Sequence, residues 1–156
     1  MTPTPTVTPT PGIASVTGGG WINSPPGAYA SNPALTGKAN FGFTISSRKG
    51  MVPTGNLQFH FKAAGFRFSS TAYTFLVVNG NQACFGGTGQ VNGSGNYGFE
   101  VTVLDGGNGA GADRFRIRIW NLDAGNAVVY DTQPGAPDCS TPTTPLGGGN
   151  IVIHKK

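Results

Sequence analysis

A run of alternating basic residues before Trp120 is the first candidate for surface chemistry. Arg114, Arg116 and Arg118 precede Trp120 at every second position, and residues two apart on a strand share one face, about 7 Å from each other. On a solvated face, three cations and an aromatic ring could bind an acidic glycan or another polyanion. The structural alternative, which we favour, is that the arginine stems cover sheet surface and Trp120 stacks against Arg118.

A second candidate is a set of acidic and amide residues in glycine-rich turns. Calcium takes about six to eight oxygen ligands, which carboxylates and loop carbonyls supply. Calcium is therefore the one cofactor that the residues suggest, although their spacing matches neither an EF-hand loop nor a repeated nonapeptide. Asp and Asn beside Gly are also ordinary turn formers, because they tolerate left-handed backbone. The candidate ligands are Asp105, Asn108, Asp113, Asp123, Asn126 and Asp131.

Aromatic residues near predicted loops form a third candidate. Trp21 lies in the segment GGGWINSPPG, where glycine would let a ligand approach the backbone, and Tyr29, Tyr73 and Tyr97 are the other rings near loops. Rings beside Asn or Asp are typical of sugar-binding sites, so Trp21 and Trp120 are candidate stacking platforms. The structural alternative is that Trp21 caps the core and Tyr97 belongs to it.

Catalytic constellations are weak by comparison, and we expect a protein that is not an enzyme. The chain has two histidines, His60 and His154, and a single glutamate, Glu100. It contains no nucleophile-elbow sequence and no zinc-ligand spacing. Glu100 also has no partner carboxylate evident from the sequence.

The two cysteines, Cys84 and Cys139, predict a disulfide if the chain is exported, because oxidising compartments preserve such bonds. Closing a loop of about 55 residues would stabilise the fold by roughly 4 kcal/mol. Two unpaired buried thiols are the alternative. Export is suggested by residues 1–12, whose TPTPTVTPTPG repeat is typical of a semi-rigid linker between exported modules. No signal peptide is visible, so we expect a piece of a longer exported protein.

Composition favours one β-rich domain over residues 13–156. Only 10% of the 156 residues are charged, whereas 26 are glycine. The net charge of +4 comes without a dense basic stripe or a nucleic-acid motif, so nucleic acid is not an expected partner. No apolar run is long enough to cross a membrane as a helix.

Apolar residues recur with a period of two from Ile13 onward, which predicts about eight to ten short strands and no significant helix. One-sided alternation is typical of antiparallel sheets with one buried face. We therefore expect an antiparallel β-sandwich, with a jelly roll as the leading variant and a closed barrel as the second choice. The segments with this alternation include KANFGFTIS, NLQFHFK, GFRFSS, NYGFEVTVLD and RFRIRIW, and YTFLVV reads as a strand buried on both faces.

Several segments resemble a family of bacterial secreted modules that follow choice-of-anchor P domains. They are GGGWINSPPGAY, LTGKANFGF, FRFSSTAYTFLVVNGNQA, GTGQVNGSGNYGFEVTVLDGG, DRFRIRIW and LGGGNIVIHK, and they span about residues 18–155. The resemblance implies an exported β-sandwich-like accessory domain with no established catalytic residues, and the two cysteines are not part of its pattern.

These observations predict a non-catalytic extracellular or cell-surface module with a structural, adhesion or display role. A carbohydrate-binding module is the first alternative. A filament subunit assembled by strand donation is the second, because a proline-rich segment beside an apolar module would suit that mode of assembly. The expected partners are neighbouring domains of the same polypeptide, cell-surface glycans or like subunits.

Overall fold

The computed structural model describes residues 14–47, 53–106 and 113–155, and within them the chain is almost entirely β-structure. The predicted linker, residues 1–12, and Asn108 lie outside the described residues. Two three-residue 3-10 turns, η1 (Lys62–Ala64) and η2 (Leu122–Ala124), are the helical elements of the described ranges. The nine strands are β1 (Ala14–Ser24), β2 (Gly37–Ser47), β3 (Thr54–Phe61), β4 (Phe66–Asn79), β5 (Gln82–Val91), β6 (Ser94–Leu104), β7 (Arg114–Asn121), β8 (Ala127–Asp131) and β9 (Gly148–Lys155).

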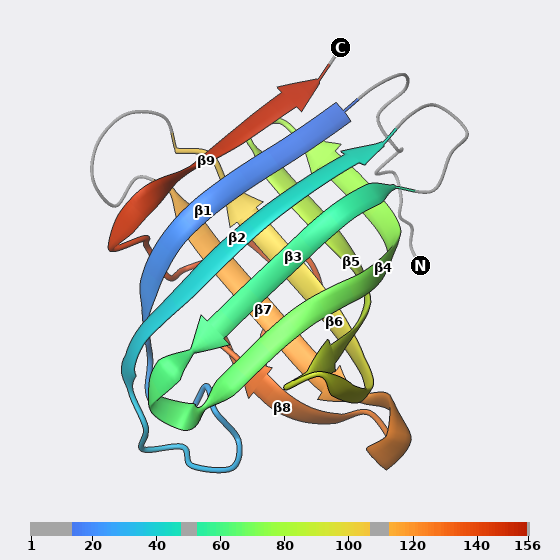
Figure 1. Cartoon of the computed structure of the whole chain (residues 1–156). Helices are drawn as coiled ribbons and strands as arrows, with labels where there is room; N and C mark the ends of the chain where they lie inside the picture. The colour runs from blue at the N-terminus through green and yellow to red at the C-terminus, as the bar shows by residue number, and fades with distance from the viewer. Residues whose placement is uncertain (1–13, 48–52, 107–112, 156) are drawn as a thin grey trace.

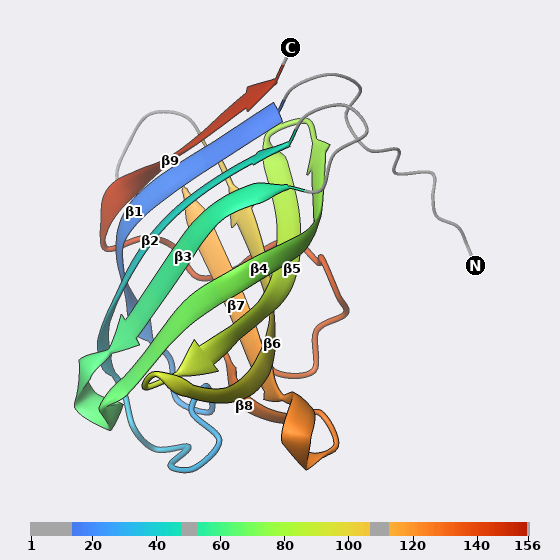
Figure 2. The ribbon, with the colours of Figure 1, turned by 45° about the vertical axis from the view of Figure 1, so that its right-hand side comes forward.

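All nine strands belong to one antiparallel sheet in the order β8-β7-β6-β5-β4-β3-β2-β1-β9. From β1 to β8 each strand pairs with the next along the chain, and β9 returns to lie beside β1. The sheet curls into a half-barrel, so that β1–β4 and β9 face β5–β8 (Figures 1 and 2). The all-β prediction and the strand count are confirmed. Two separate sheets are not confirmed, because continuous pairing from β8 to β9 leaves no break between halves.

The core fills the space between the two halves of the curled sheet. Phe41 of β2 stacks on Phe115 of β7, with ring centroids 4.1 Å apart, and Phe59 of β3 packs against Tyr130 of β8 at 4.9 Å. These contacts join residues far apart in sequence, as expected when alternating apolar side chains share the concave face. The inward assignments for β2, β3 and the start of β4 are confirmed: Ala39, Phe41, Phe43, Ile45, Leu57, Phe59, Phe61, Phe66 and Phe68 are all buried.

Strand β4 departs from simple alternation, because its register to β5 shifts twice, between Ser70 and Ala72 and between Tyr73 and Phe75. The YTFLVV run is therefore not buried on both faces throughout, since Thr74 is exposed while Tyr73 and Leu76 are buried. A side chain at Gly87, the partner of Tyr73, would collide with the carbonyl oxygen of Ala72. Glycine at this position lets the two backbones approach at the irregularity.

Both edges of the sheet are covered. At β8, Asp131 donates its backbone N–H to the carbonyl of Ala28 at 2.9 Å, so the loop between β1 and β2 pairs with that edge. At β9, the N–H of Ile151 donates to Asp113 Oδ2 at 2.7 Å and that of Ile153 to Asp105 Oδ2 at 3.4 Å. Carboxylates thus take the place of a neighbouring strand, and free ladder donors are a known aggregation hazard.

We expect Asp113→Asn to destabilise the chain by about 2 kcal/mol, because Asp113 also accepts the N–H of Gly106 and an amide has only one oxygen for two donors. A fall of about 4–8 °C in Tm corresponds to this loss, with faster hydrogen exchange at the Ile151 amide. Asp123→Asn is the matched control, since Asp123 is exposed. Unchanged exchange at the Ile151 amide would contradict the role of the Asp113 carboxylate at the β9 edge.

Candidate functional site

The segment 132–147, which we call the strap, connects β8 to β9 and crosses the outer face of β5, β6 and β7 (Figure 2). Its contacts with these strands include Cys84 of β5, Glu100 of β6 and Arg116 of β7. The alternation had placed Glu100 and Thr102 on an outward face, and the strap buries both, at 7% and 0% exposure. The outer side of this half of the sheet is therefore a second, polar interior.

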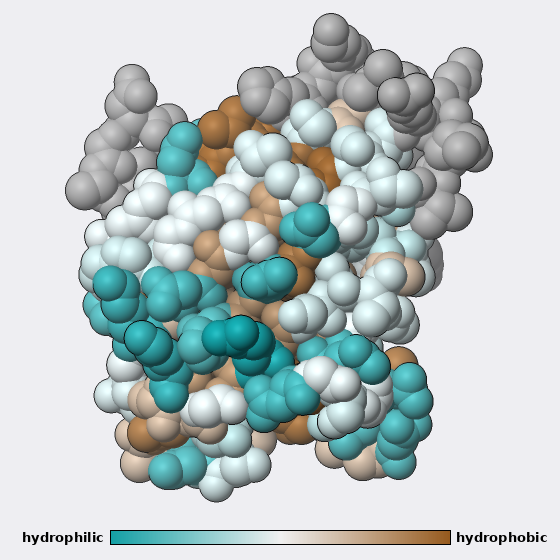
Figure 3. Space-filling model, viewed as in Figure 1, coloured by the Kyte–Doolittle hydropathy of each residue, from teal (hydrophilic) through white to brown (hydrophobic). Residues whose placement is uncertain are grey.

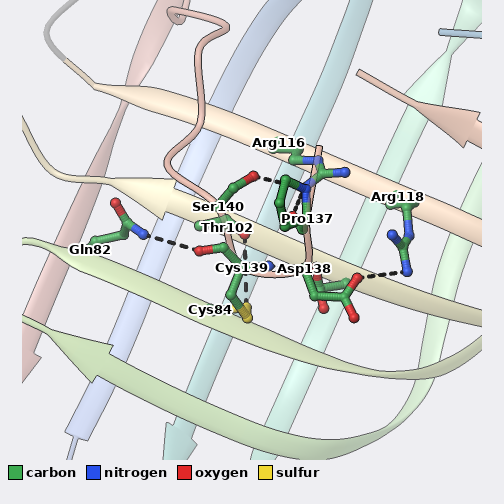
Figure 4. The surroundings of a disulfide bond; sticks show 10 residues. Gln82, Cys84, Thr102, Arg116, Arg118, Pro137, Asp138, Cys139 and Ser140 are labelled. Atoms are coloured by element: carbon green, nitrogen blue, oxygen red, sulfur yellow. Dashed lines mark hydrogen bonds and ion pairs between the residues drawn. A yellow bond between two sulfur atoms is a disulfide. The ribbon is translucent and has the colours of Figure 1, made fainter. Parts of the chain in front are cut away.

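Cys84 and Cys139 form a disulfide that joins β5 to the strap, with Cα atoms 5.6 Å apart (Figure 4). The bond closes a separation of 55 residues and confirms the predicted pair. Thr102 lies beneath it and donates to the Cys84 sulfur at 3.8 Å. Gln82 of β5 donates to the Cys139 carbonyl at 3.4 Å, so the bridge is supported from its own strand and from the neighbouring β6.

Arg116 is the central contact of the strap and is only 1% exposed. Its Nε and Nη2 donate to the two carboxylate oxygens of Asp131, at 3.2 and 3.1 Å. Its remaining donors reach the strap, including the Pro137 carbonyl at 2.7 Å and the Ser140 hydroxyl at 3.1 Å. A buried guanidinium is tolerated only when it is paired and hydrogen-bonded, so these contacts make the strap part of the folded structure.

Glu100 accepts the backbone N–H of Cys139 at 3.0 Å. Burial raises the pKa of its carboxyl group above the ordinary value, while the hydrogen bond from Cys139 opposes the rise. Asp138 adds to the rise, and Arg118 and Arg116 lower it. Glu100 thus holds the strap in place, and a raised pKa at this position has a structural cause.

Cys84, Glu100 and Cys139 are also the one group within the described ranges whose side chains could together ligate a metal, with ligand atoms within 4.8 Å of one another. Thiolates are the cysteine species that bind metals, and here both sulfurs are consumed in the disulfide. The cluster therefore acts as a covalent and hydrogen-bonded anchor.

The arginine stripe shares one face of β7, but its members have different surroundings. Arg116 is buried under the strap, Arg114 is exposed, and Arg118 pairs with Asp138 at 2.8 Å. The guanidinium of Arg118 also lies 5.1 Å from the Trp120 ring centroid, as the structural alternative predicted. An open row of three cations is therefore not formed, because the strap occupies its middle.

Within the described residues, no three of the candidate carboxylates Asp105, Asp113, Asp123 and Asp131 come close enough together to hold a metal ion. Asp131 pairs with Arg116, and Asp123 accepts from Asn96 beside η2. Asn126 adopts a left-handed conformation in a turn, with φ of 65°, as turn-forming residues do. Asp105 and Asp113 lie near β9, on either side of the segment that contains Asn108. Calcium at that segment stays a prediction.

The predicted aromatic platforms are partly withdrawn from the surface. Tyr73 is buried and donates to the Thr44 carbonyl at 3.1 Å, while Tyr29 packs edge-on against Phe66. Trp21 lies on the outer face of β1, where Gly147 and Gly148 leave room for its ring. The Lys38 ammonium sits 4.6 Å from the Trp21 ring centroid, a cation–π contact that fixes both side chains.

The outer face of β2 and β3 carries a depression of about 310 Å³, which we call the amide groove. Figure 3 shows this side of the molecule from outside, with hydrophilic residues across its middle. Burial lowers the pKa of His60, and the neighbouring charges of Arg67 and then Lys62 lower it further. The groove is lined by Asn40, Phe41, Gly42, Asn56, Gln58 and His60.

Sequence reasoning missed the amide groove, although alternation placed Asn40, Gly42, Gln58 and His60 outward. The missing information is the pairing, in which Asn40 lies opposite His60 and Gly42 opposite Gln58. Only that register makes one surface of the two outward sets.

Comparisons with protein families, with characterised proteins and with solved structures gave no match to this chain. The resemblance to modules that follow choice-of-anchor P domains therefore stays a prediction. No helix within the described residues is long and apolar enough to cross a membrane.

Replacing Cys84 and Cys139 together by alanine is expected to cost about 4 kcal/mol, the chain-entropy value for a loop of this length. Thermal melting would show a fall in Tm of about 10 °C. Reduction of the wild-type chain should give a similar fall and should leave the double variant unchanged. Equal Tm values for oxidised and reduced wild type would refute a stabilising role for the bridge.

Glu100→Gln is expected to remove a pH dependence of stability. Because the folded carboxyl has a raised pKa, folding favours the proton, and this contribution is full below the ordinary pKa and is lost as pH rises through the folded pKa. The wild-type free energy of unfolding, relative to that of Glu100→Gln, should therefore fall across this window in chemical denaturation. A difference that is flat with pH would contradict burial of an ionisable Glu100.

Proposed function

We propose that this chain is a non-catalytic accessory module of an exported protein, which attaches or displays its parent polypeptide at the cell surface. The observation that carries the proposal is the disulfide-anchored strap. It uses the charges of Arg116, Asp131 and Glu100 for structure, and a disulfide of this kind is typical of oxidising, extracellular surroundings. A locked scaffold of this type suits attachment better than turnover.

The amide groove supports a binding role within the same proposal. It presents side-chain amides on a rigid sheet, and rigid elements position binding groups more accurately than loops do. Its partner would be a glycan of the cell surface, in line with the carbohydrate-binding alternative. Neighbouring domains of the same polypeptide are the other expected partners.

Filament assembly by strand donation receives less support from the geometry. A donated strand needs an open edge, whereas the β8 edge pairs with residues of the β1–β2 loop. The β9 edge has its donors bound by Asp113 and Asp105. A donor strand would have to displace these contacts before it could pair.

The proposal is tested by incubating the purified chain with isolated cell-envelope material and with a panel of insoluble polysaccharides. We expect the chain to sediment with at least one of them and to release no soluble sugar over prolonged incubation. A disulfide-bonded protein of similar charge and no glycan affinity serves as the control for non-specific retention. Release of sugar in proportion to the amount of chain, or absence of retention on every material, would overturn the proposal.

A further inference from the structure

We propose that the amide groove and its basic rim bind a carboxylate-bearing polysaccharide, with the chain of sugars running across β1, β2 and β3. This inference rests on the proposed attachment function and names the class of glycan and the surface that would bind it. The rim consists of Lys38, Lys62 and Arg67, and the groove is that defined above.

Strand register builds the groove from two rows of residues that cross the sheet. Trp21, Asn40, His60 and Arg67 lie side by side on β1, β2, β3 and β4. The next row, two residues along each strand, is Gly19, Gly42, Gln58 and Ser69. The first row, which begins with Trp21, forms a wall of the groove. The second row forms its floor, and the first two positions of that floor have no side chain.

The floor is open because residues 19 and 42 are glycine, although packing does not require glycine at either position. A side-chain carbon at Gly42 would meet no atom within 4 Å, and one at Gly19 would meet only the Phe41 carbonyl oxygen, at 3.8 Å. Neither residue has a positive φ that would require glycine. Glycine inside a strand weakens it and often marks close approach of a ligand, so these two positions keep the groove accessible at some cost in strand stability.

The groove offers the donors and acceptors that sugar hydroxyls require. Among the described residues, the side-chain amides of Asn40, Asn56 and Gln58 have no hydrogen-bond partner in the chain, and all three residues are exposed. Each amide carries both a donor and an acceptor, which matches a hydroxyl group that can act as either. Under the strap, by contrast, the polar side chains of Gln82, Glu100 and Arg116 are already bonded.

Charge selects an acidic glycan over a neutral one. Strands β1–β4 contain no Asp or Glu, because all six acids lie between Glu100 and Asp138. Lys38 is held over Trp21 at one end of the wall. At the other end, Arg67 lies opposite His60 in the strand register. The lowered pKa of His60 reflects, after burial, the positive charge of Arg67 and Lys62, and such a field attracts carboxylates.

The test measures binding of the full chain to polygalacturonate by titration calorimetry, with dextran as the neutral polymer and duplex DNA as a non-glycan polyanion. We expect binding to polygalacturonate that weakens with salt, and at least about tenfold weaker binding to dextran and to DNA. Equal or tighter binding to either would overturn the inference.

Gly42→Leu separates a binding groove from a structural one. Because its space is empty, the variant should keep or raise the wild-type Tm while losing at least about tenfold in affinity for polygalacturonate. Ala127→Leu adds similar bulk at an exposed position of β8 and should bind like wild type. Wild-type affinity in a folded Gly42→Leu chain would overturn the inference.

One rim charge and one charge away from the groove give a second, independent readout. Lys38→Gln should weaken binding and reduce its salt dependence, whereas Arg114→Gln, an exposed residue on β7, should change neither. If wild type and Gly42→Leu are retained equally on envelope material, the groove inference fails and the attachment function stands. If polygalacturonate is depolymerised by the wild-type chain, the proposed non-catalytic function itself fails.

Discussion

The buried guanidinium of Arg116 is the interaction on which the arrangement of this chain depends. A charge taken out of water must be fully paired, and one Asp131 carboxylate supplies only part of what five N–H donors need. The carbonyls and hydroxyl of the strap supply the rest. The strap must therefore cross β7 at this point, and the disulfide between Cys139 and Cys84 fixes the same path two strands further along, at β5.

This path divides the sheet into halves with different surroundings. Strands β5–β7 are covered on the concave side by the aromatic core and on the convex side by the strap, so even Thr102 is fully buried. Strands β2 and β3 keep a solvated convex face with the amide groove. The strap also leads into β9, whose donors then meet Asp113 and Asp105. The same stretch of chain therefore covers the outer face of β5–β7 and then forms the protected β9 edge.

The division separates structural polarity from polarity that is free to bind. Charged groups near Arg116 are bonded to one another, which leaves them little freedom for catalysis or recognition. Amides at the groove face water and stand on a rigid sheet beside Trp21 and Lys38. This combination of a locked scaffold and an open polar face is what the proposed attachment function requires.

Alternation in the sequence by itself determined the β class, the strand number and the inward residues such as Phe41 and Phe59, because a two-residue period fixes which side chains share a face. The cysteine pair also followed from the residues and their expected compartment. Alternation could not decide that the sheet is continuous, nor that Glu100 and Arg116 are buried, because a long segment from elsewhere in the chain covers their outward face. Only the register between strands brought Asn40, Gly42, Gln58 and His60 into one groove, since neighbours across strands are set by tertiary pairing and not by distance along the chain.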